Sequence, residues 1–121
     1  MNIFRSLFST SSRISPAMAS QKVQSLIDEN TVMVFSKSYC PYCRSTKQLL
    51  EKSGAIYKAI ELDQESDGSD LQNALEGISG QRTVPNIYIQ QKHIGGNSDL
   101  QSLANGGKLD KLLQENGAVK A

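Results

Sequence analysis

Hydrophobic positions along the chain follow two periods, one typical of amphipathic helices and one typical of buried strands. Val23 and Ile27 recur at helical spacing behind Ser20, a favourable N-cap, so we expect a helix that begins at Ser20 and ends near residue 30. Residues 31–35 (TVMVF) then form a short apolar run rich in β-branched side chains. Such a run predicts a parallel strand that is buried on both faces.

The remaining pattern predicts seven further helices and strands. We expect a helix over residues 41–52, a strand over 56–62, a third helix closed by Ser79-Gly80, a hairpin from 86–89 and 92–94, and two short final helices. The inward faces of the last three helices are marked by Leu71, Ala74, Leu75 and Ile78, by Leu100 and Leu103, and by Leu109, Leu112 and Leu113. The order is therefore helix–strand–helix–strand–helix, then a hairpin and two helices.

Two details of this pattern concern the sheet. Lys58 interrupts the apolar residues of the 56–62 strand and predicts an edge position for it. Gln90-Gln91 separates the two strands of the hairpin, and glutamine is a poor residue for a two-residue turn that needs positive φ. We therefore expect a longer or bulged connection between these strands.

Candidate chemistry is concentrated in the sequence Cys40-Pro41-Tyr42-Cys43, which contains both cysteines of the chain. A single C-x-x-C at a strand-to-helix junction indicates thiol–disulfide redox chemistry. Pro41 fits the first helical position, which places Cys40 at the helix N-terminus, where free N–H groups and the helix dipole favour a thiolate. We predict that Cys40 is the attacking sulfur and that the more shielded Cys43 resolves the intermediate.

Other uses of two cysteines explain the sequence less well. A structural zinc site needs four ligands, whereas this chain has one cysteine pair and a single distant His93. The acidic stretch at residues 63–67 lacks a partner set for a cation, so no metal site is predicted. A structural disulfide across so short a loop would constrain little.

Length and charge limit the remaining possibilities. A chain of 121 residues predicts one domain, and it contains no apolar run of the length that spans a membrane. Residues 1–19 hold Arg5 and Arg13 and no acid, while the remainder holds 11 basic and 12 acidic side chains. No basic stripe is left in the body of the chain, which argues against nucleic acid as a partner.

The first 19 residues are typical of a mitochondrial leader. They are rich in serine and free of acid, and as a helix they would place Ile3, Phe4, Leu7 and Phe8 on one face. An N-terminal tail without any targeting role is the alternative. Met18 stands just before the first predicted helix, so we expect a mitochondrial long form and a cytoplasmic form that starts at Met18. We expect residues 1–19 to be disordered and residues 20–121 to form the domain.

Three further features suggest a site for a peptide-like thiol. Thr83-Val84-Pro85 directly precedes a predicted strand. A cis peptide bond at Pro85 would place the backbone of Val84 beside the cysteine pair, where it could pair with a peptide-like ligand. An ordinary trans proline is the commoner case. Ser98-Asp99 follows two glycines at a helix start and offers free N–H groups to a carboxylate, unless Ser98 only caps the helix. Lys37, three residues before Cys40, is a candidate anchor for a carboxylate.

Taken together, three motifs resemble the dithiol glutaredoxins. They are Cys40-Pro41-Tyr42-Cys43, Gly80-Gln81-Arg82-Thr83-Val84-Pro85 and Gly95-Gly96-Asn97-Ser98-Asp99-Leu100, and the resemblance covers about residues 20–117. The leader with an internal methionine resembles in particular the fungal glutaredoxins made in mitochondrial and cytosolic forms. The chain departs from the family at Gln90-Gln91, where relatives commonly have Asn-Gly.

The resemblance implies a thioredoxin-like α/β fold, a four-stranded mixed sheet in the order 2-1-3-4 flanked by helices. It implies a monomeric enzyme that reduces protein–glutathione mixed disulfides and protein disulfides, with glutathione as reducing co-substrate and no permanently bound cofactor. Cys40 corresponds to the nucleophile and Cys43 to the resolving cysteine. The implied glutathione contacts are Lys37, Gln72 and Arg82 at the glycyl carboxylate, Tyr42 beside the sulfur, Thr83, Val84 and Pro85 at the cysteinyl unit, and Ser98 and Asp99 at the γ-glutamyl end.

Two other functions compete with this interpretation. A thioredoxin-type disulfide reductase usually has Gly-Pro between its cysteines, where this chain has Pro41-Tyr42. A carrier of a glutathione-ligated [2Fe-2S] cluster usually has a small residue after the first cysteine, a position that Pro41 occupies here. Absorbance of anaerobically purified protein would identify a cluster, and reduction of a glutathionylated substrate would separate a glutaredoxin from a thioredoxin.

Overall fold

The computed structural model describes residues 14–121, and its central layer is a four-stranded mixed sheet in the order β2-β1-β3-β4. The strands are β1 (Val32–Ser36), β2 (Lys58–Glu61), β3 (Asn86–Ile89) and β4 (Lys92–Gly95). β1 pairs in parallel with β2 and antiparallel with β3, and β3 pairs antiparallel with β4. This order confirms the predicted thioredoxin-like fold and the edge position of the strand that contains Lys58.

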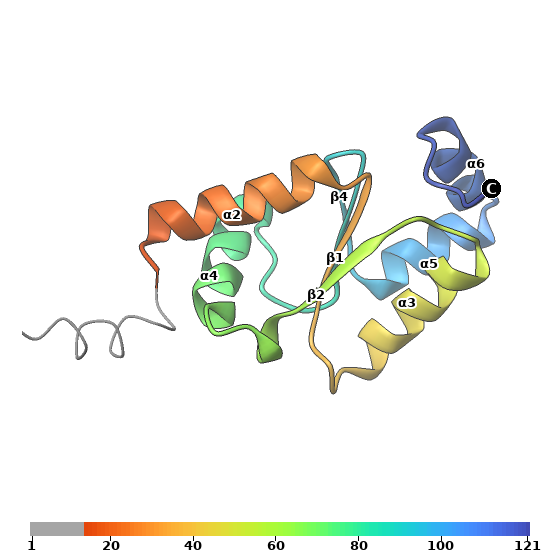
Figure 1. Cartoon of the computed structure of the whole chain (residues 1–121). Helices are drawn as coiled ribbons and strands as arrows, with labels where there is room; N and C mark the ends of the chain where they lie inside the picture. The colour runs from red at the N-terminus through yellow and green to blue at the C-terminus, as the bar shows by residue number, and fades with distance from the viewer. Residues whose placement is uncertain (1–13) are drawn as a thin grey trace, which may run out of the picture.

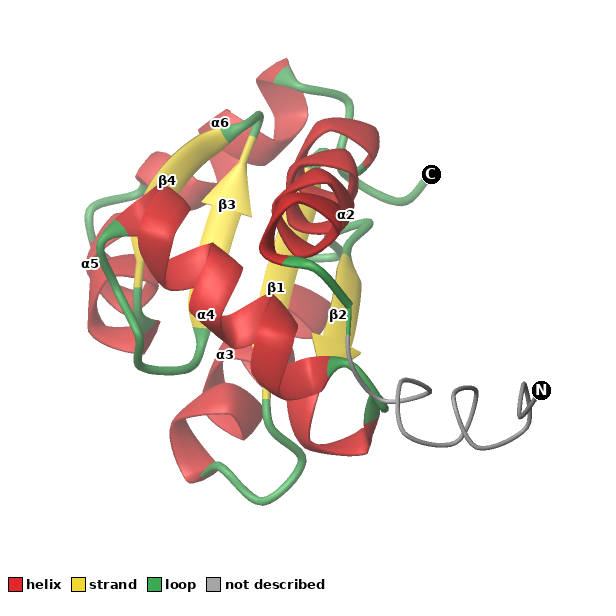
Figure 2. Cartoon of the chain, turned by 90° about the vertical axis from the view of Figure 1, so that its left-hand side faces the viewer, coloured by secondary structure: helices red, strands yellow, loops and turns green. Residues whose placement is uncertain are grey.

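Helices cover both faces of the sheet (Figure 1). They are α2 (Pro16–Glu29), α3 (Pro41–Lys52), α4 (Gly68–Ser79), α5 (Asn97–Asn105) and α6 (Lys108–Glu115), with the short 3-10 helix η1 (Leu62–Gln64) before α4. Figure 2 shows α2 and α4 in front of the sheet, with α3 and α5 behind it. No helix among residues 14–121 is long and apolar enough to cross a membrane.

The two faces of β1 supply two separate hydrophobic cores, because successive side chains of a strand point to opposite sides. Val32 and Val34 pack with residues of α3, α5 and α6, whereas Met33 and Phe35 pack with residues of α2 and α4. Every residue of β1 is buried. β1 is therefore a rigid support for the loops at its two ends.

The N-terminal helix begins earlier than the sequence pattern predicted. The expected N-cap, Ser20, lies inside α2, which begins at Pro16 and is capped by Ser15, whose Oγ accepts the N–H of Met18 at 3.1 Å. Ser-Pro is itself a strong helix start, and Ala19 is buried against the core. The expected domain boundary between residues 19 and 20 is thus wrong for residues 14–19, while the leader expected at residues 1–13 lies outside the described residues.

The hairpin turn also differs from expectation. Gln90 and Gln91 form a two-residue turn with φ of 50° and 66°, where we expected a longer or bulged connection. The irregularity in pairing lies instead inside the hairpin, next to Ile87 and Tyr88. Tertiary pairing on both sides has imposed positive φ on two glutamines.

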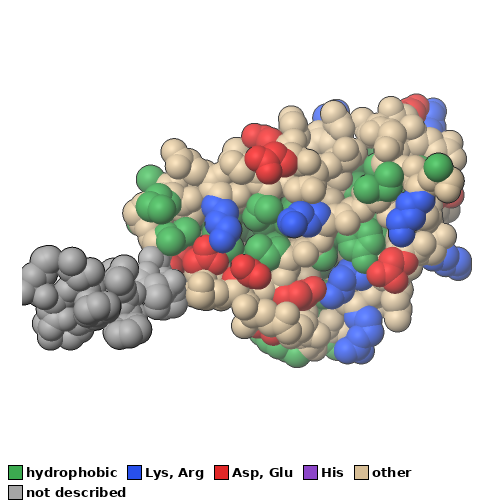
Figure 3. Space-filling model, viewed as in Figure 1, with side chains coloured by type: hydrophobic (Ala, Val, Ile, Leu, Met, Phe, Trp, Pro, Cys, Tyr) green, Lys and Arg blue, Asp and Glu red, His purple; other side chains and the backbone are tan. Residues whose placement is uncertain are grey.

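The outer surface carries charges of both signs. Figure 3 shows acidic and basic side chains interspersed over the visible face, with apolar atoms between them. Ion pairs join Lys22 with Asp67 at 2.7 Å and Lys47 with Glu61 at 2.8 Å. This face therefore has no large region of a single charge.

Replacing Gln90-Gln91 by Asn-Gly should stabilise the protein. A non-glycine residue in the left-handed backbone region destabilises the folded protein by roughly 1–2 kcal/mol. Glycine avoids this strain, but its greater conformational freedom in the unfolded chain offsets part of the stabilisation. We expect the free energy of unfolding to rise by about 1 kcal/mol in urea titrations. Gln114→Gly, within α6, should lower it by a similar amount; an unchanged hairpin variant would show that the turn is not strained.

Candidate functional site

Cys40 lies where the chain leaves β1 and enters α3, as predicted. It is the N-cap of α3, and its Sγ accepts the N–H of Cys43 at 3.2 Å. The carbonyl of Cys40 accepts the N–H of Arg44, which continues the helix. A negative sulfur is stabilised in this place by the N–H donor and by the positive end of the helix dipole.

Cys43 has the opposite environment. Its side chain is fully buried on the inner face of α3. Burial, followed by its hydrogen bond with Cys40, raises the pKa of Cys43 to about 11. Cys43 is therefore a protonated thiol at neutral pH, whereas Cys40 is partly exposed, and both cysteines are free. The two sulfurs therefore differ in exposure, and the buried one is held as a thiol.

The loop before β3 approaches the cysteines from the other side. The Val84–Pro85 peptide bond is cis, as the sequence analysis allowed. The carbonyl oxygen of Val84 lies 3.8 Å from Sγ of Cys40. Because β3 runs antiparallel to β1, this loop and the cysteine turn meet at the same end of the sheet.

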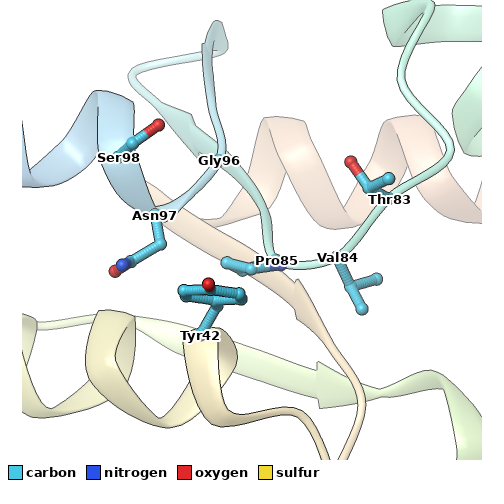
Figure 4. Close-up of a pocket in the computed structure, with 7 residues that line it drawn as sticks. All are labelled: Tyr42, Thr83, Val84, Pro85, Gly96, Asn97 and Ser98. Atoms are coloured by element: carbon cyan, nitrogen blue, oxygen red, sulfur yellow. The ribbon is translucent and has the colours of Figure 1, made fainter.

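A cavity of about 460 Å³ opens beside this contact (Figure 4). Its lining consists of Tyr42, Thr83, Val84, Pro85, Gly96, Asn97 and Ser98. In Figure 4 the Thr83–Pro85 loop and the Gly96–Ser98 segment stand on opposite sides, and the Tyr42 ring rises from α3 between them. The cavity is lined by residues of three separate motifs, among them the predicted Tyr42, Thr83, Val84, Pro85 and Ser98. Its size is typical of small-molecule sites.

Asp99 holds the Gly96–Ser98 wall in place. Its Oδ2 accepts the N–H of Gly96 at 2.9 Å, and Gly96, not Ser98, is the N-cap of α5. Gly95 has φ of 117°, and a Cβ at this position would collide with the carboxylate of Asp99. Ser98 remains exposed at the cavity, so the alternative in which it only caps the helix does not describe this structure.

The expected anchors for a glycyl carboxylate lie outside the cavity lining. Gln72 donates from Nε2 to the carbonyl of Arg82 at 2.9 Å. Arg82 donates from Nη1 to Glu76 at 3.0 Å and to Asn73 at 2.9 Å. Lys37 is half-buried in the turn after β1.

The turn that carries Lys37 is tied to η1. Asp63 accepts the N–H of Ser38 at 2.9 Å and also its hydroxyl. These hydrogen bonds, the hydroxyl of Ser38 first, lower the pKa of Asp63. The segment between β1 and Cys40 is therefore held in place by hydrogen bonds to η1, independently of α3.

Sequence reasoning missed Gly96 and Asn97 as lining residues. Asn97 also links the two helices of the site, because its Oδ1 accepts hydrogen bonds from Thr46 at 2.9 Å and from Gln101 at 3.3 Å. Thr46 is fully buried on α3. The two glycines before Asn97 signalled a ligand approach, but nothing in a single sequence indicated a partner 51 residues away.

The residues of the site include no cluster suited to a metal. Across residues 14–121, no group of three or more His, Cys, Asp or Glu side chains is placed to hold a metal ion.

The environments of the two cysteines predict very different rates of alkylation. At about pH 7.5, Cys43 in a Cys40→Ser variant should react with iodoacetamide at least about 100-fold more slowly than Cys40 in a Cys43→Ser variant, because its thiolate fraction is small. The Cys43 rate should keep rising with pH above the ordinary thiol pKa, because burial, the largest cause of the raised pKa, is kept in the Cys40→Ser variant. Both variants should react alike in concentrated urea, and equal rates in the folded proteins would contradict the assignment.

Comparison with known proteins places the chain in a family. The glutaredoxin family model matches residues 32–94. A glutaredoxin of Vernicia fordii is 60% identical over 104 residues, which cover 86% of this chain and all of that protein. Glutaredoxin-2 of Schizosaccharomyces pombe is 46% identical over 99 residues, which cover 82% of this chain and 90% of that protein. The higher identity to a plant protein means that the expected fungal likeness is not confirmed.

Solved structures agree with the sequence comparison. A crystal structure of a buckwheat glutaredoxin–glutathione complex superimposes with a TM-score of 0.84 at 50% identity, covering 87% of this chain and 96% of that one. A crystal structure of wheat glutaredoxin superimposes with a TM-score of 0.82 at 53% identity, covering 87% and 97% of the two chains. The chain therefore belongs to the glutaredoxin family and is a glutathione-dependent thiol oxidoreductase.

Proposed function

We propose that the protein reduces protein–glutathione mixed disulfides and protein disulfides, with Cys40 as nucleophile and Cys43 as resolving cysteine. The observation that carries this proposal is the pairing of a partly exposed Cys40 at a helix N-terminus with a fully buried Cys43. The cavity beside Cys40 provides space for a tripeptide-sized ligand. The buckwheat relative, whose structure is a glutathione complex, supports glutathione as that ligand.

Deglutathionylation then requires only Cys40. Its thiolate attacks the glutathione sulfur of the mixed disulfide, so that a Cys40–glutathione disulfide forms and the protein sulfur leaves as a thiolate, which takes up a proton. The thiolate of a second glutathione attacks the glutathione sulfur held on Cys40. Oxidised glutathione is released and the Cys40 thiolate is regenerated.

Reduction of a protein disulfide uses both cysteines. Cys40 attacks one sulfur of the disulfide, and the partner sulfur leaves as a thiolate. Cys43 then loses its proton and attacks the Cys40 sulfur, which forms the Cys40–Cys43 disulfide and releases the second substrate thiol. Two glutathione molecules reduce this internal disulfide and leave as oxidised glutathione.

Bound glutathione would lie between the two walls of the cavity. The backbone of Val84 would pair with the cysteinyl unit, with Thr83 and Pro85 shaping the loop and Tyr42 flanking the sulfur. Ser98 and the free N–H groups at the start of α5 would take the γ-glutamyl carboxylate, with Asp99 near the ammonium. Lys37, Gln72 and Arg82 would turn toward the glycyl carboxylate, with Arg82 sharing its charge between Glu76 and the ligand.

The proposed enzyme acts as a monomer on glutathione and on glutathionylated or disulfide-containing proteins, without a permanently bound cofactor. We also propose a mitochondrial long form and a cytoplasmic form that starts at Met18. The acid-free leader supports import. Met18 lies in the first turn of α2, so the short form would lose Ser15 and Pro16, the residues that start this helix.

The two cysteine variants should differ in activity. Cys40→Ser should abolish reduction of every disulfide, because it removes the attacking sulfur. Cys43→Ser should retain reduction of a glutathionylated peptide and lose most reduction of a protein disulfide, because only the second reaction needs an internal disulfide. Coupled turnover with glutathione and its recycling reductase measures both. Equal loss of deglutathionylation in both variants would overturn the assignment of roles.

Replacing Met18 by Leu should remove the cytoplasmic form. With a tag at the C-terminus, cell fractionation should show the mitochondrial pool unchanged and the cytoplasmic pool lost, since only the internal start has been removed. Met33→Leu serves as the matched control and should leave both pools as they were. An unchanged cytoplasmic pool in Met18→Leu would disprove internal initiation.

A further inference from the structure

The loop that carries Val84 has its carbonyl groups occupied by side chains on both sides of that residue. Gln81 donates from Nε2 to the carbonyl of Thr83 and to the carbonyl of Pro85, each at 3.0 Å. Gln72 donates to the carbonyl of Arg82 at 2.9 Å. The carbonyl of Val84 instead faces Cys40, with its oxygen 3.8 Å from Sγ.

From this arrangement we propose that Gln81 is a positioning residue, which clamps the carbonyls of Thr83 and Pro85 so that the backbone of Val84 is presented to the thiol ligand. The proposal rests on the proposed function and names a residue for substrate selection within it. Gln81 does not line the cavity or touch the reacting sulfur. It would act through the backbone it holds.

The clamp is itself held in place. The N–H of Gln81 donates to Oγ of Ser79 at 3.0 Å, and its carbonyl accepts from that hydroxyl at 3.2 Å and from Nδ2 of Asn86 at 3.3 Å. Asn86 is fully buried at the start of β3 and also donates to Ser79. Gln81 is thereby fixed to the end of α4 and to the central sheet, so its amide has a rigid support.

The side-chain amide nitrogen of Gln81 carries two hydrogens, so it can donate to both carbonyls at once. The primary amide of Gln81 satisfies two carbonyls that lie two residues apart and would otherwise need other partners. These two carbonyls are thus kept from competing for a ligand, and the loop is ordered before a ligand arrives. Ordering a binding segment in advance reduces the entropy cost of binding.

Loss of the clamp should affect some thiol ligands and not others. A ligand that pairs with the Val84 backbone, such as the cysteinyl unit of glutathione, depends on the orientation of that peptide unit. A small thiol without peptide groups, such as β-mercaptoethanol, does not. Removing the clamp should therefore weaken recognition of the first ligand and leave attack by Cys40 intact.

Two variants test the clamp. Gln81→Glu keeps the shape but replaces the donor nitrogen with an acceptor oxygen, and Gln81→Leu removes the polar group. Gln114, exposed on α6, provides the matched controls Gln114→Glu and Gln114→Leu. Each protein is assayed on one peptide in two forms, glutathionylated and modified by β-mercaptoethanol, with Cys40 alkylation and circular dichroism recorded alongside.

We expect kcat/KM for the glutathionylated peptide to fall about tenfold in Gln81→Leu and further in Gln81→Glu, mainly through KM. Turnover of the β-mercaptoethanol form and the rate of Cys40 alkylation should stay within about twofold, as should all values for the controls. Equal losses on both peptides would show that Gln81 has only a structural role. No loss on either would show that the clamp is irrelevant.

A measurement on the unmodified protein keeps the proposal testable if the variants fail to fold. Hydrogen-bond couplings in NMR should connect Nε2 of Gln81 to the carbonyls of Thr83 and Pro85, and the Val84 amide should shift on addition of S-methylglutathione. Absent couplings would overturn the clamp. Failure of the proposed function would be distinct, because the parent enzyme would then show no preference between the two peptides.

Discussion

The position of Cys40 depends on one constraint, the turn from the buried strand β1 into helix α3. β1 is buried on both faces, and α3 is fixed to the same sheet by Leu50, which is fully buried in the core that the two elements share. The sulfur of Cys40 is therefore supported by the two cores together. Antiparallel pairing of β3 with β1 brings Val84 to the same end, and the return of β4 brings Gly95 there, so three loops meet over one sulfur.

The side chains of Cys40 and Cys43 differ chemically because the fold places them in different environments. Cys40 lies outside the first turn of α3 and accepts a backbone N–H, whereas Cys43 lies one turn further along on the face that packs inward. The first environment stabilises negative charge and the second opposes it, which is why the pKa of Cys43 is raised. The difference in environment between the two sulfurs is thus set by packing.

The sequence pattern predicted the elements with strong local signals and missed features that depend on distant contacts. The helix over residues 41–52 agreed with the sequence pattern, and the order of the sheet agreed with what the glutaredoxin resemblance implied. The cis bond at Pro85 is the rarer of the two forms that the sequence left open. α2 begins before the expected Ser20, because its start signal, Ser15-Pro16, lies within the stretch that resembles a leader. The tight turn at Gln90-Gln91 could not be predicted, because strand pairing overrides the local preference of glutamine, and the Thr46–Asn97 bond joins residues far apart in the chain.

The contact between Gly95 and Asp99 has a consequence for how this loop can vary. Any side chain at Gly95 would displace the carboxylate that holds the N–H of Gly96. Position 95 is therefore restricted to glycine for as long as Asp99 holds this place. A designer who transplants this loop to another scaffold has to move Gly95 and Asp99 together.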